Sequence, residues 1–245
     1  MSLCPVLYPP NVEFLPYCVY YRFNNPEMNA DDISKIIRVL RSESPGWDVP
    51  AVTLEAESSH DPFRVLISTV LSLRTKDETT AAASGRLFSI ADNPEDMLNL
   101  GEEEIIQAIY PVGFYRTKAK NILGICRDLI DKYGSRVPND LENLLQLKGV
   151  GRKTANLVLT LGYGKHGICV DTHVHRISNR LGYIKTRNPH DTEMALRNKL
   201  PKRYWIEYNS LLVAFGQHIC RPVSPKCTLC PVEYYCDKAG VQKSR

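Results

Sequence analysis

The 245-residue chain lacks any run of about 20 uninterrupted apolar residues, so the sequence predicts no membrane-spanning helix. The alternating apolar and polar pattern of strands is also almost absent, and residues 19–23 (VYYRF) are the best strand candidate. The opening residues have no basic start and contain several prolines, which argues against a secretory signal. These absences favour an all-α protein that is neither secreted nor embedded in a membrane.

A strong excess of one charge sign is missing as well, because 31 lysines and arginines face 27 acids for a net charge of +4. The charge is unevenly distributed, however. Residues 148–187 carry eight basic side chains and a single acid, Asp171. Such a stretch suits a polyanionic partner, although a solvated basic face is the plain alternative.

Apolar residues spaced three and four apart, together with capping residues, predict helices along most of the chain. The predicted segments are 31–43, 62–73, 76–88, short helices beginning near 93–95 and 101–102, and then 118–133, 141–147, 151–162, 172–181, 190–199 and 203–218.

The stretch LKGVGRKTA, residues 147–155, places two glycines between two of these helices. Gly149 and Gly151 allow positive φ and a close backbone approach. The amides at the start of the following helix would suit a phosphate without reading any base. A helix corner that needs glycines for steric reasons alone is the alternative, and the adjacent Arg152 and Lys153 favour the phosphate.

Lys153 falls in the first turn of its predicted helix, beside Arg152. Most helical lysines are simply solvated, but a helix N-terminus and a neighbouring cation disfavour an ammonium and favour the nucleophilic neutral amine. Asp171 precedes the next predicted helix, where a carboxylate can cap the helix and stay ionised. The same anion would oppose the effect of the helix end on the lysine. We expect His173 to pack on its helix or to contact a phosphate.

Four cysteines, Cys220, Cys227, Cys230 and Cys236, crowd into 17 residues with the spacing C-x6-C-x2-C-x5-C. Four thiolates in so short a segment indicate one compact metal centre. Both zinc and a [4Fe–4S] cluster fit such a donor set. Zinc sites usually pair two short hooks, and only one is present here.

Taken together, residues 147–155, the stretch VDTHVHR at 170–176 and the terminal cysteines resemble the endonuclease III family of helix-hairpin-helix DNA glycosylases. The resemblance extends over roughly residues 30–236. It implies two all-α lobes with a DNA-binding cleft between them and a C-terminal loop that holds a [4Fe–4S] cluster. The implied divisions are an irregular arm at 1–28, a central domain at 62–169 that includes the helix-hairpin-helix at about 141–162, and a cluster domain formed by 29–61 with 170–245.

The resemblance also implies an activity in base-excision repair, the removal of oxidised pyrimidines from duplex DNA. Lys153 would attack C1′ of the damaged nucleoside and cut the strand by β-elimination through a Schiff base, and Asp171 would stabilise the positive sugar. Arg74 stands where the family commonly fills the DNA gap with glutamine, and Phe114 is an apolar wedge or, alternatively, a core aromatic. The remaining expected DNA contacts are Lys148, Gly149, Val150, Gly151, Arg152 and His173, with Lys118 and Lys120 flanking the backbone.

The expected partner is duplex DNA with damaged bases or abasic sites, bound by a monomer in the cytoplasm near the nucleoid. Two alternatives stay open: a mismatch-specific glycosylase of the same superfamily, and a non-catalytic DNA-binding iron–sulfur protein. Lys153 argues against the first, because mismatch relatives carry another residue there. A purely DNA-binding module would need neither Lys153 nor Asp171.

Overall fold

The computed structural model describes residues 28–245, and within this range it is built from helices without a strand. The principal helices are α2 (Ala30–Glu43), α3 (Ala51–Ser59), α4 (Pro62–Ser72), α5 (Asp77–Phe88), α6 (Pro94–Asn99), α7 (Glu102–Ile109), α8 (Tyr115–Tyr133), α9 (Leu141–Leu144), α10 (Arg152–Leu157), α11 (Thr172–Arg180), α12 (Pro189–Lys199) and α13 (Tyr208–His218). The all-α prediction is confirmed, while residues 1–27 of the expected arm, with the strand candidate at 19–23, lie outside the described residues. No helix in the described range is long and apolar enough to cross a membrane.

Most helices begin where the sequence places a capping residue. Asp61 accepts a hydrogen bond from the Phe63 amide, and proline occupies the first turn of α4. Asn188 caps α12 in the same way. Helix α3 was not predicted, because its apolar residues form no continuous stripe. Helix α10 is shorter than predicted, because residues 158–162 form a π-helical turn.

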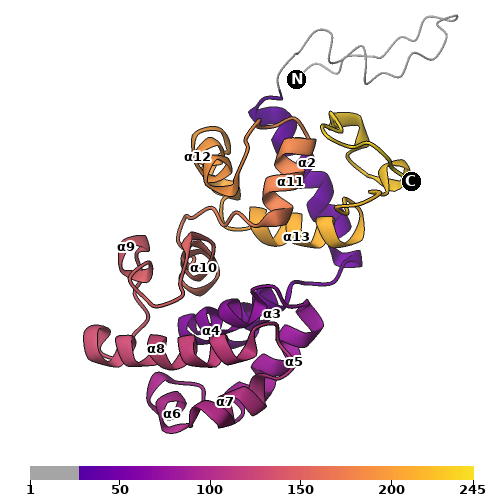
Figure 1. Ribbon diagram of the computed structural model, residues 1–245. Helices are drawn as coiled ribbons and strands as arrows, with labels where there is room; N and C mark the ends of the chain where they lie inside the picture. Colours follow the sequence, from indigo (N-terminus) through magenta and orange to yellow (C-terminus); the bar gives the residue numbers. More distant parts are fainter. Residues whose placement is uncertain (1–27) are drawn as a thin grey trace, which may run out of the picture.

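The helices form two lobes, each with its own apolar core (Figure 1). One core is built from α3 to α10, and the other from α2, α11, α12 and α13 with the C-terminal segment. The chain passes between the cores twice, once between α2 and α3 and once at residues 168–170. Helix α10 lies where the lobes meet, so the first turn of α10 is at their junction.

Helix α3 packs in a different core from the one that the sequence suggested. Val52 and Ala56 are buried in the core of α4 to α8, whereas residues 29–61 were expected to join the cluster domain as one piece. The expectation missed this because Pro50 and the weak apolar pattern of α3 hide the point where the chain changes lobes. We therefore propose the same two domains with the first boundary moved to about residue 50.

Candidate active site

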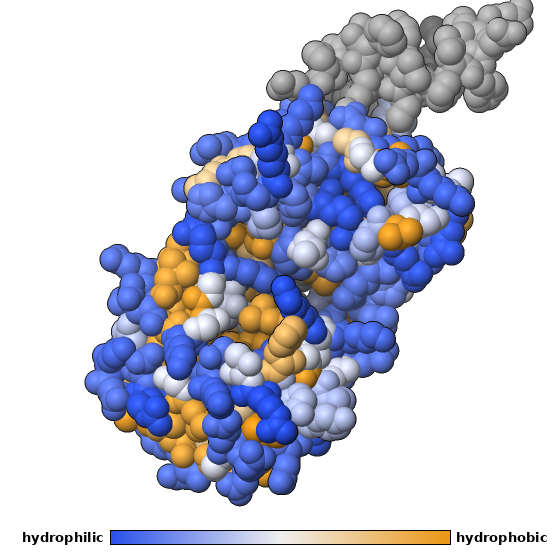
Figure 2. Space-filling view, viewed as in Figure 1, coloured by the Kyte–Doolittle hydropathy of each residue, from blue (hydrophilic) through white to orange (hydrophobic). Residues whose placement is uncertain are grey.

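A cleft of about 580 Å³ opens between the two lobes. The surface of the molecule narrows where the lobes meet (Figure 2). Both lobes line the cleft, which is bounded by Ser72, Leu73, Arg74, Thr75, Lys76, Asp77, Lys153, Leu157, Val170, Asp171, Thr172, His173, Asn209, Val213 and Gln217, among others. The structure thus brings four of the predicted site residues, Arg74, Lys153, Asp171 and His173, to one cavity.

Lys153 reaches the cleft from the second position of α10. Its side chain is half-buried, and within residues 28–245 no hydrogen bond or salt bridge engages its amine. The residue that precedes the helix, Gly151, has an extended backbone and no side chain that could cover the first turn. The amine is therefore neither sealed in the interior nor neutralised by a paired acid.

Asp171 faces the same cleft from the start of α11. Its Oδ1 accepts hydrogen bonds from the amides of His173 and Val174, at 2.8 and 2.9 Å. Both bonds use one oxygen, and none of the described residues donates to Oδ2. The carboxylate thus caps the helix, as expected, while its second oxygen stays available to a molecule in the cleft.

The charges of Lys153 and Asp171 act on the same neighbours. Burial raises the pKa of the Cys169 thiol, the Lys153 ammonium lowers it and the Asp171 carboxylate raises it. Burial likewise lowers the pKa of His173, and Asp171 raises it while Lys153 lowers it. The amine and the carboxylate therefore lie close enough to share an electrostatic environment.

His173 is held in one tautomer. Nη2 of Arg176 lies 3.1 Å from Nδ1 of His173, and because arginine can only donate, Nδ1 accepts and Nε2 carries the proton. Burial lowers the pKa of the ring, which agrees with a neutral imidazole. A Cβ at Gly216 would approach Nδ1 to 2.3 Å, so glycine is needed beneath the ring. His173 therefore combines packing with a donor at the cleft.

The glycine turn between α9 and α10 uses its two glycines differently. Gly149 has φ of +79°, and a Cβ there would approach Nδ2 of Asn121 on α8 to 2.7 Å. Gly151 is extended, with φ of −98°, and no atom obstructs a Cβ there. Val150 is buried, and the Lys148 side chain lies against Gly124 of α8. The left-handed backbone is thus required at Gly149 alone, and phosphate binding by this turn stays a prediction.

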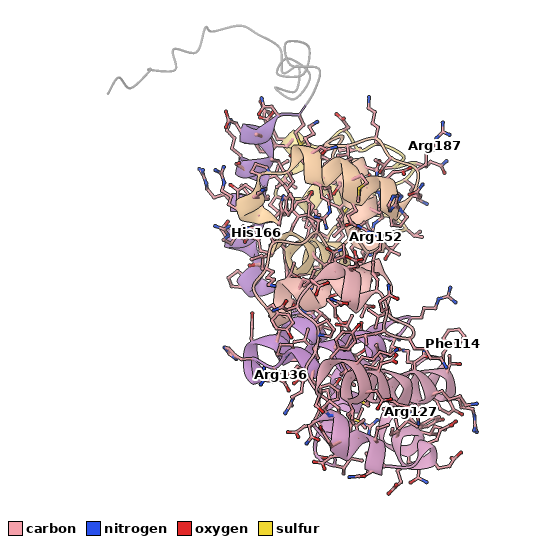
Figure 3. The ribbon with its side chains drawn as sticks, turned by 90° about the vertical axis from the view of Figure 1, so that its left-hand side faces the viewer. Phe114, Arg127, Arg136, Arg152, His166 and Arg187 are labelled. Carbon is pink, nitrogen blue, oxygen red and sulfur yellow. The ribbon has the colours of Figure 1, made fainter. Side chains whose placement is uncertain are left out.

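Arg152 has a structural partner that the sequence did not suggest. Its guanidinium donates to both carboxylate oxygens of Glu193 on α12, at 2.7 and 2.9 Å, and Arg197 donates to the same carboxylate. The Glu193 side chain is only 4% exposed. Figure 3 shows Arg152 at the junction of the lobes. The ion pair connects the start of α10 to the other lobe. Only the edge of the Arg152 guanidinium that does not face Glu193 is available for a phosphate contact.

Arg74 and Phe114 come from different loops of the lobe built from α3 to α10 but lie against each other, and Arg74 lines the cleft. The Arg74 guanidinium carbon lies 5.5 Å from the centre of the Phe114 ring. Both residues have positive φ, 54° and 58°. Phe114 is 62% exposed, so the core-aromatic alternative is wrong, and its side chain projects from the edge of the lobe (Figure 3).

Lys118 does not flank a DNA backbone as expected. It is 5% exposed and its amine donates to protein oxygens at the end of α4. Lys120, two residues further along α8, is exposed beside Glu102. The periodicity of α8 hinted at this difference, because Lys118 falls on the same face as Ile122 and Ile125.

The four terminal cysteines line one small cavity with Arg180 and Lys238. Burial raises the pKa of Cys230 to about 12 and that of Cys236 to about 11. Nη1 of Arg180 lies 3.5 Å from Sγ of Cys220, and the Lys238 amide donates to Sγ of Cys236 at 3.3 Å. Within the described range, no group of three or more histidine, cysteine, aspartate or glutamate side chains is arranged to hold a single metal ion. Four thiols around a shared cavity with N–H donors are a donor set that fits an iron–sulfur cluster.

Fold and cleft together define a helical protein with a helix-hairpin-helix at the junction of two lobes. The family profile of the HhH-GPD superfamily of base excision DNA repair proteins matches residues 67–202. The sequence is 51% identical over 177 residues to endonuclease III of Thermotoga maritima, covering 72% of this chain and 83% of that one.

Solved structures agree with the sequence comparison. A non-covalent endonuclease III–DNA complex superposes with a TM-score of 0.76 at 34% identity, over 86% of this chain and 96% of that chain. A trapped endonuclease III–DNA covalent intermediate gives 0.69 at 39% identity, over 73% and 84%. The chain belongs to the HhH-GPD superfamily of base excision DNA repair proteins and, within it, to the endonuclease III family.

Proposed function

We propose that this protein is a bifunctional DNA glycosylase and abasic-site lyase that removes oxidised pyrimidines from duplex DNA. The observation that carries the proposal is the placement of Lys153 and Asp171 on one accessible cleft between two lobes. Membership of the endonuclease III family supports the enzyme class. The substrate class rests on the resemblance to that family.

The two side chains have complementary tasks. The neutral amine of Lys153 attacks C1′ of the nucleoside, and the bond to the base breaks with its electron pair going to the leaving base. Positive charge develops on the sugar, and the fixed Asp171 carboxylate stabilises it. The nitrogen of the adduct loses a proton, the C1′–O4′ bond opens with O4′ taking up a proton, and a Schiff base forms between Lys153 and C1′. The Schiff base acidifies the C2′ proton, and loss of that proton expels the 3′ phosphate by β-elimination.

The target atom lies inside a stacked duplex, so the nucleotide must be extruded into the cleft and the gap must be filled. Arg74 and Phe114 suit the second task because both are exposed, the guanidinium lies over the ring, and Arg74 lines the cleft. A guanidinium can donate hydrogen bonds to the base left without a partner. The basic stretch that contains Lys148, Lys165 and Lys185 suits the phosphate backbone.

Cys220, Cys227, Cys230 and Cys236 would hold a [4Fe–4S] cluster. The cluster would supply a rigid centre that orders the C-terminal loop against α11, whose residues Ile177 and Arg180 line the same cavity. Iron and acid-labile sulfide, measured in protein purified without oxygen, test this assignment. One equivalent of zinc in place of iron would contradict it.

The function is tested by borohydride reduction in the presence of DNA. Wild-type protein should become covalently attached to duplexes that contain an abasic site or an oxidised pyrimidine, because borohydride reduces a Schiff base to a stable amine. Lys153→Ala should abolish trapping while DNA affinity changes by less than about tenfold, since one cation among many phosphate contacts is lost. The matched control is Lys132→Ala, which removes an exposed lysine from the end of α8 and should trap normally.

Two results would contradict the proposal. Trapping of Lys153→Ala at the wild-type level would remove the lysine from the reaction. Release of undamaged adenine or thymine from mismatches, without action on oxidised pyrimidines, would favour the mismatch glycosylase.

A further inference from the structure

Lys118 is a buried lysine whose amine is fully used inside the protein. Its Nζ donates to the carbonyl oxygens of Leu71 and Leu73 at 2.6 and 2.7 Å, and to Oγ1 of Thr75 at 2.9 Å. An ammonium has three donors, so none is left for an outside ligand. The residue is 5% exposed, which excludes a contact with a DNA phosphate.

The acceptors lie at one particular place. Leu71 is in the last turn of α4 and Leu73 follows the helix, where backbone carbonyls lack partners within the helix and the dipole is negative. Thr75 belongs to the same loop, which continues to α5 along the cleft. Lys118 therefore fastens α8 beneath the loop that carries Arg74.

A second set of contacts joins this loop to the one that carries Phe114. The Gly113 amide donates to Oγ1 of Thr75 at 3.1 Å. A Cβ at residue 113 would lie 2.5 Å from the Arg74 carbonyl oxygen, so the two backbones touch at a glycine. We name Lys118, Thr75 and Gly113 the loop latch.

The loop latch sits directly under two residues in an unfavourable conformation. Arg74 and Phe114 both occupy the left-handed region, which residues with a Cβ avoid unless their surroundings hold them there. Each is next to a latch residue in the sequence, Arg74 beside Thr75 and Phe114 beside Gly113. The stacked pair is thus assembled before DNA arrives.

We propose that Lys118 is a positioning residue that holds Arg74 and Phe114 in the geometry needed to fill the gap left by an extruded nucleotide. This inference rests on the function proposed above. It concerns extrusion of a paired nucleotide alone, because the chemistry at Lys153 and Asp171 involves no atom of the latch.

The test compares two DNA substrates. In one duplex an oxidised pyrimidine faces a purine, so a gap opens when it leaves the stack. In the other the same lesion lies in a single-nucleotide bulge, where no opposite base loses its partner. Lys118→Met should lower kcat/KM for base release from the paired duplex roughly 10–100-fold, the size expected when positioning is lost. On the bulge it should stay within about threefold of wild type.

Thr75→Val provides a second variant that leaves the buried amine in place. It removes one acceptor of Lys118 and the acceptor of Gly113, so it should show the same selective loss at a smaller size. Lys132→Met is the matched control, since it removes an exposed lysine from the same helix and should behave as wild type on both substrates.

An equal loss on both substrates, in either latch variant, would make Lys118 a residue of general stability and would overturn the inference. Unchanged rates of Lys118→Met on the paired duplex would overturn it as well. If wild-type protein released the base from neither substrate, the proposed function itself would be wrong. Borohydride trapping at an abasic site distinguishes this failure of the proposed function from a failure of the inference about Lys118.

Discussion

Lys118 and Lys153 both lie in the first turn of a helix, α8 and α10, yet they serve opposite purposes. The amine of Lys118 is enclosed by three protein oxygens at the end of α4. The amine of Lys153 faces a cleft that also holds Asp171. The two lysines differ in what lies opposite each amine. Lys118 faces the end of a helix with free carbonyl oxygens, whereas Lys153 faces the open cleft between the lobes.

The comparison also shows what a lowered lysine pKa does not prove. Burial lowers the pKa of Lys118 to about 8, a value often associated with a nucleophilic amine. No substrate can reach it, because the side chain is 5% exposed and all its donors are engaged. Access to a cavity with a carboxylate is therefore the better guide to the reactive lysine of this protein.

The largest effect is expected from Asp171→Asn, which tests whether Lys153 depends on the carboxylate that Lys118 lacks. Asparagine also caps helices well, so α11 should persist and only the charge is lost. Base release in single turnover should fall roughly 10²–10³-fold, the cost of removing one electrostatic stabiliser of a transition state. Asp61→Asn, at the equivalent cap of α4, is the control and should keep its rate. A rate for Asp171→Asn within a few-fold of wild type would show that the reaction of Lys153 does not depend on the Asp171 carboxylate.

A smaller effect is expected from Glu193→Gln, which loosens the helix of Lys153 and leaves that of Lys118 untouched. The buried carboxylate receives Arg152 and Arg197, so its loss leaves two guanidinium groups without their partner. Urea denaturation should show a free energy of unfolding lower by roughly 2–4 kcal/mol. Glu207→Gln removes the similar but exposed fork with Arg41 and should cost at most about 1 kcal/mol. An equal decrease in the free energy of unfolding for the two variants would show that the burial of Glu193 adds nothing to the strength of its ion pairs.

The two lysines show which features of the protein can be predicted from the sequence and which cannot. Helix starts such as that of α4 were predictable because Asp61 and Pro62 act locally. The placement of Lys153 and Asp171 on one cleft was expected from a resemblance, and the structure brings them together. Local patterns could not reveal the acceptors of Lys118, because they belong to residues 43 to 47 positions away in the chain.

Partners distant in sequence account for the other misses too. Glu193 and Arg152 are 41 residues apart in the sequence, and neither segment contains a pattern that predicts their ion pair. Arg74 and Phe114 were separate candidates on separate loops, and their stacking depends on the close approach that Gly113 permits. Helix α3 changes lobes because Val52 and Ala56 find space in the core of α4 to α8, a consequence of packing and not of propensity.

The smallest effect is a pH dependence of stability that only Lys118 should cause. The folded pKa of about 8 lies below the value of about 10.4 for an unfolded lysine, so between these values the unfolded chain binds more protons. The free energy of unfolding contributed by this group should therefore rise with pH. Urea denaturation at pH 7.5 and 9.5 measures this effect. Between the two pH values, the free energy of unfolding of wild type relative to that of Lys118→Met should increase by about 1–2 kcal/mol. Cysteines and tyrosines titrate in both proteins and cancel, so a flat or opposite difference would mean that burial does not disfavour the charge of Lys118.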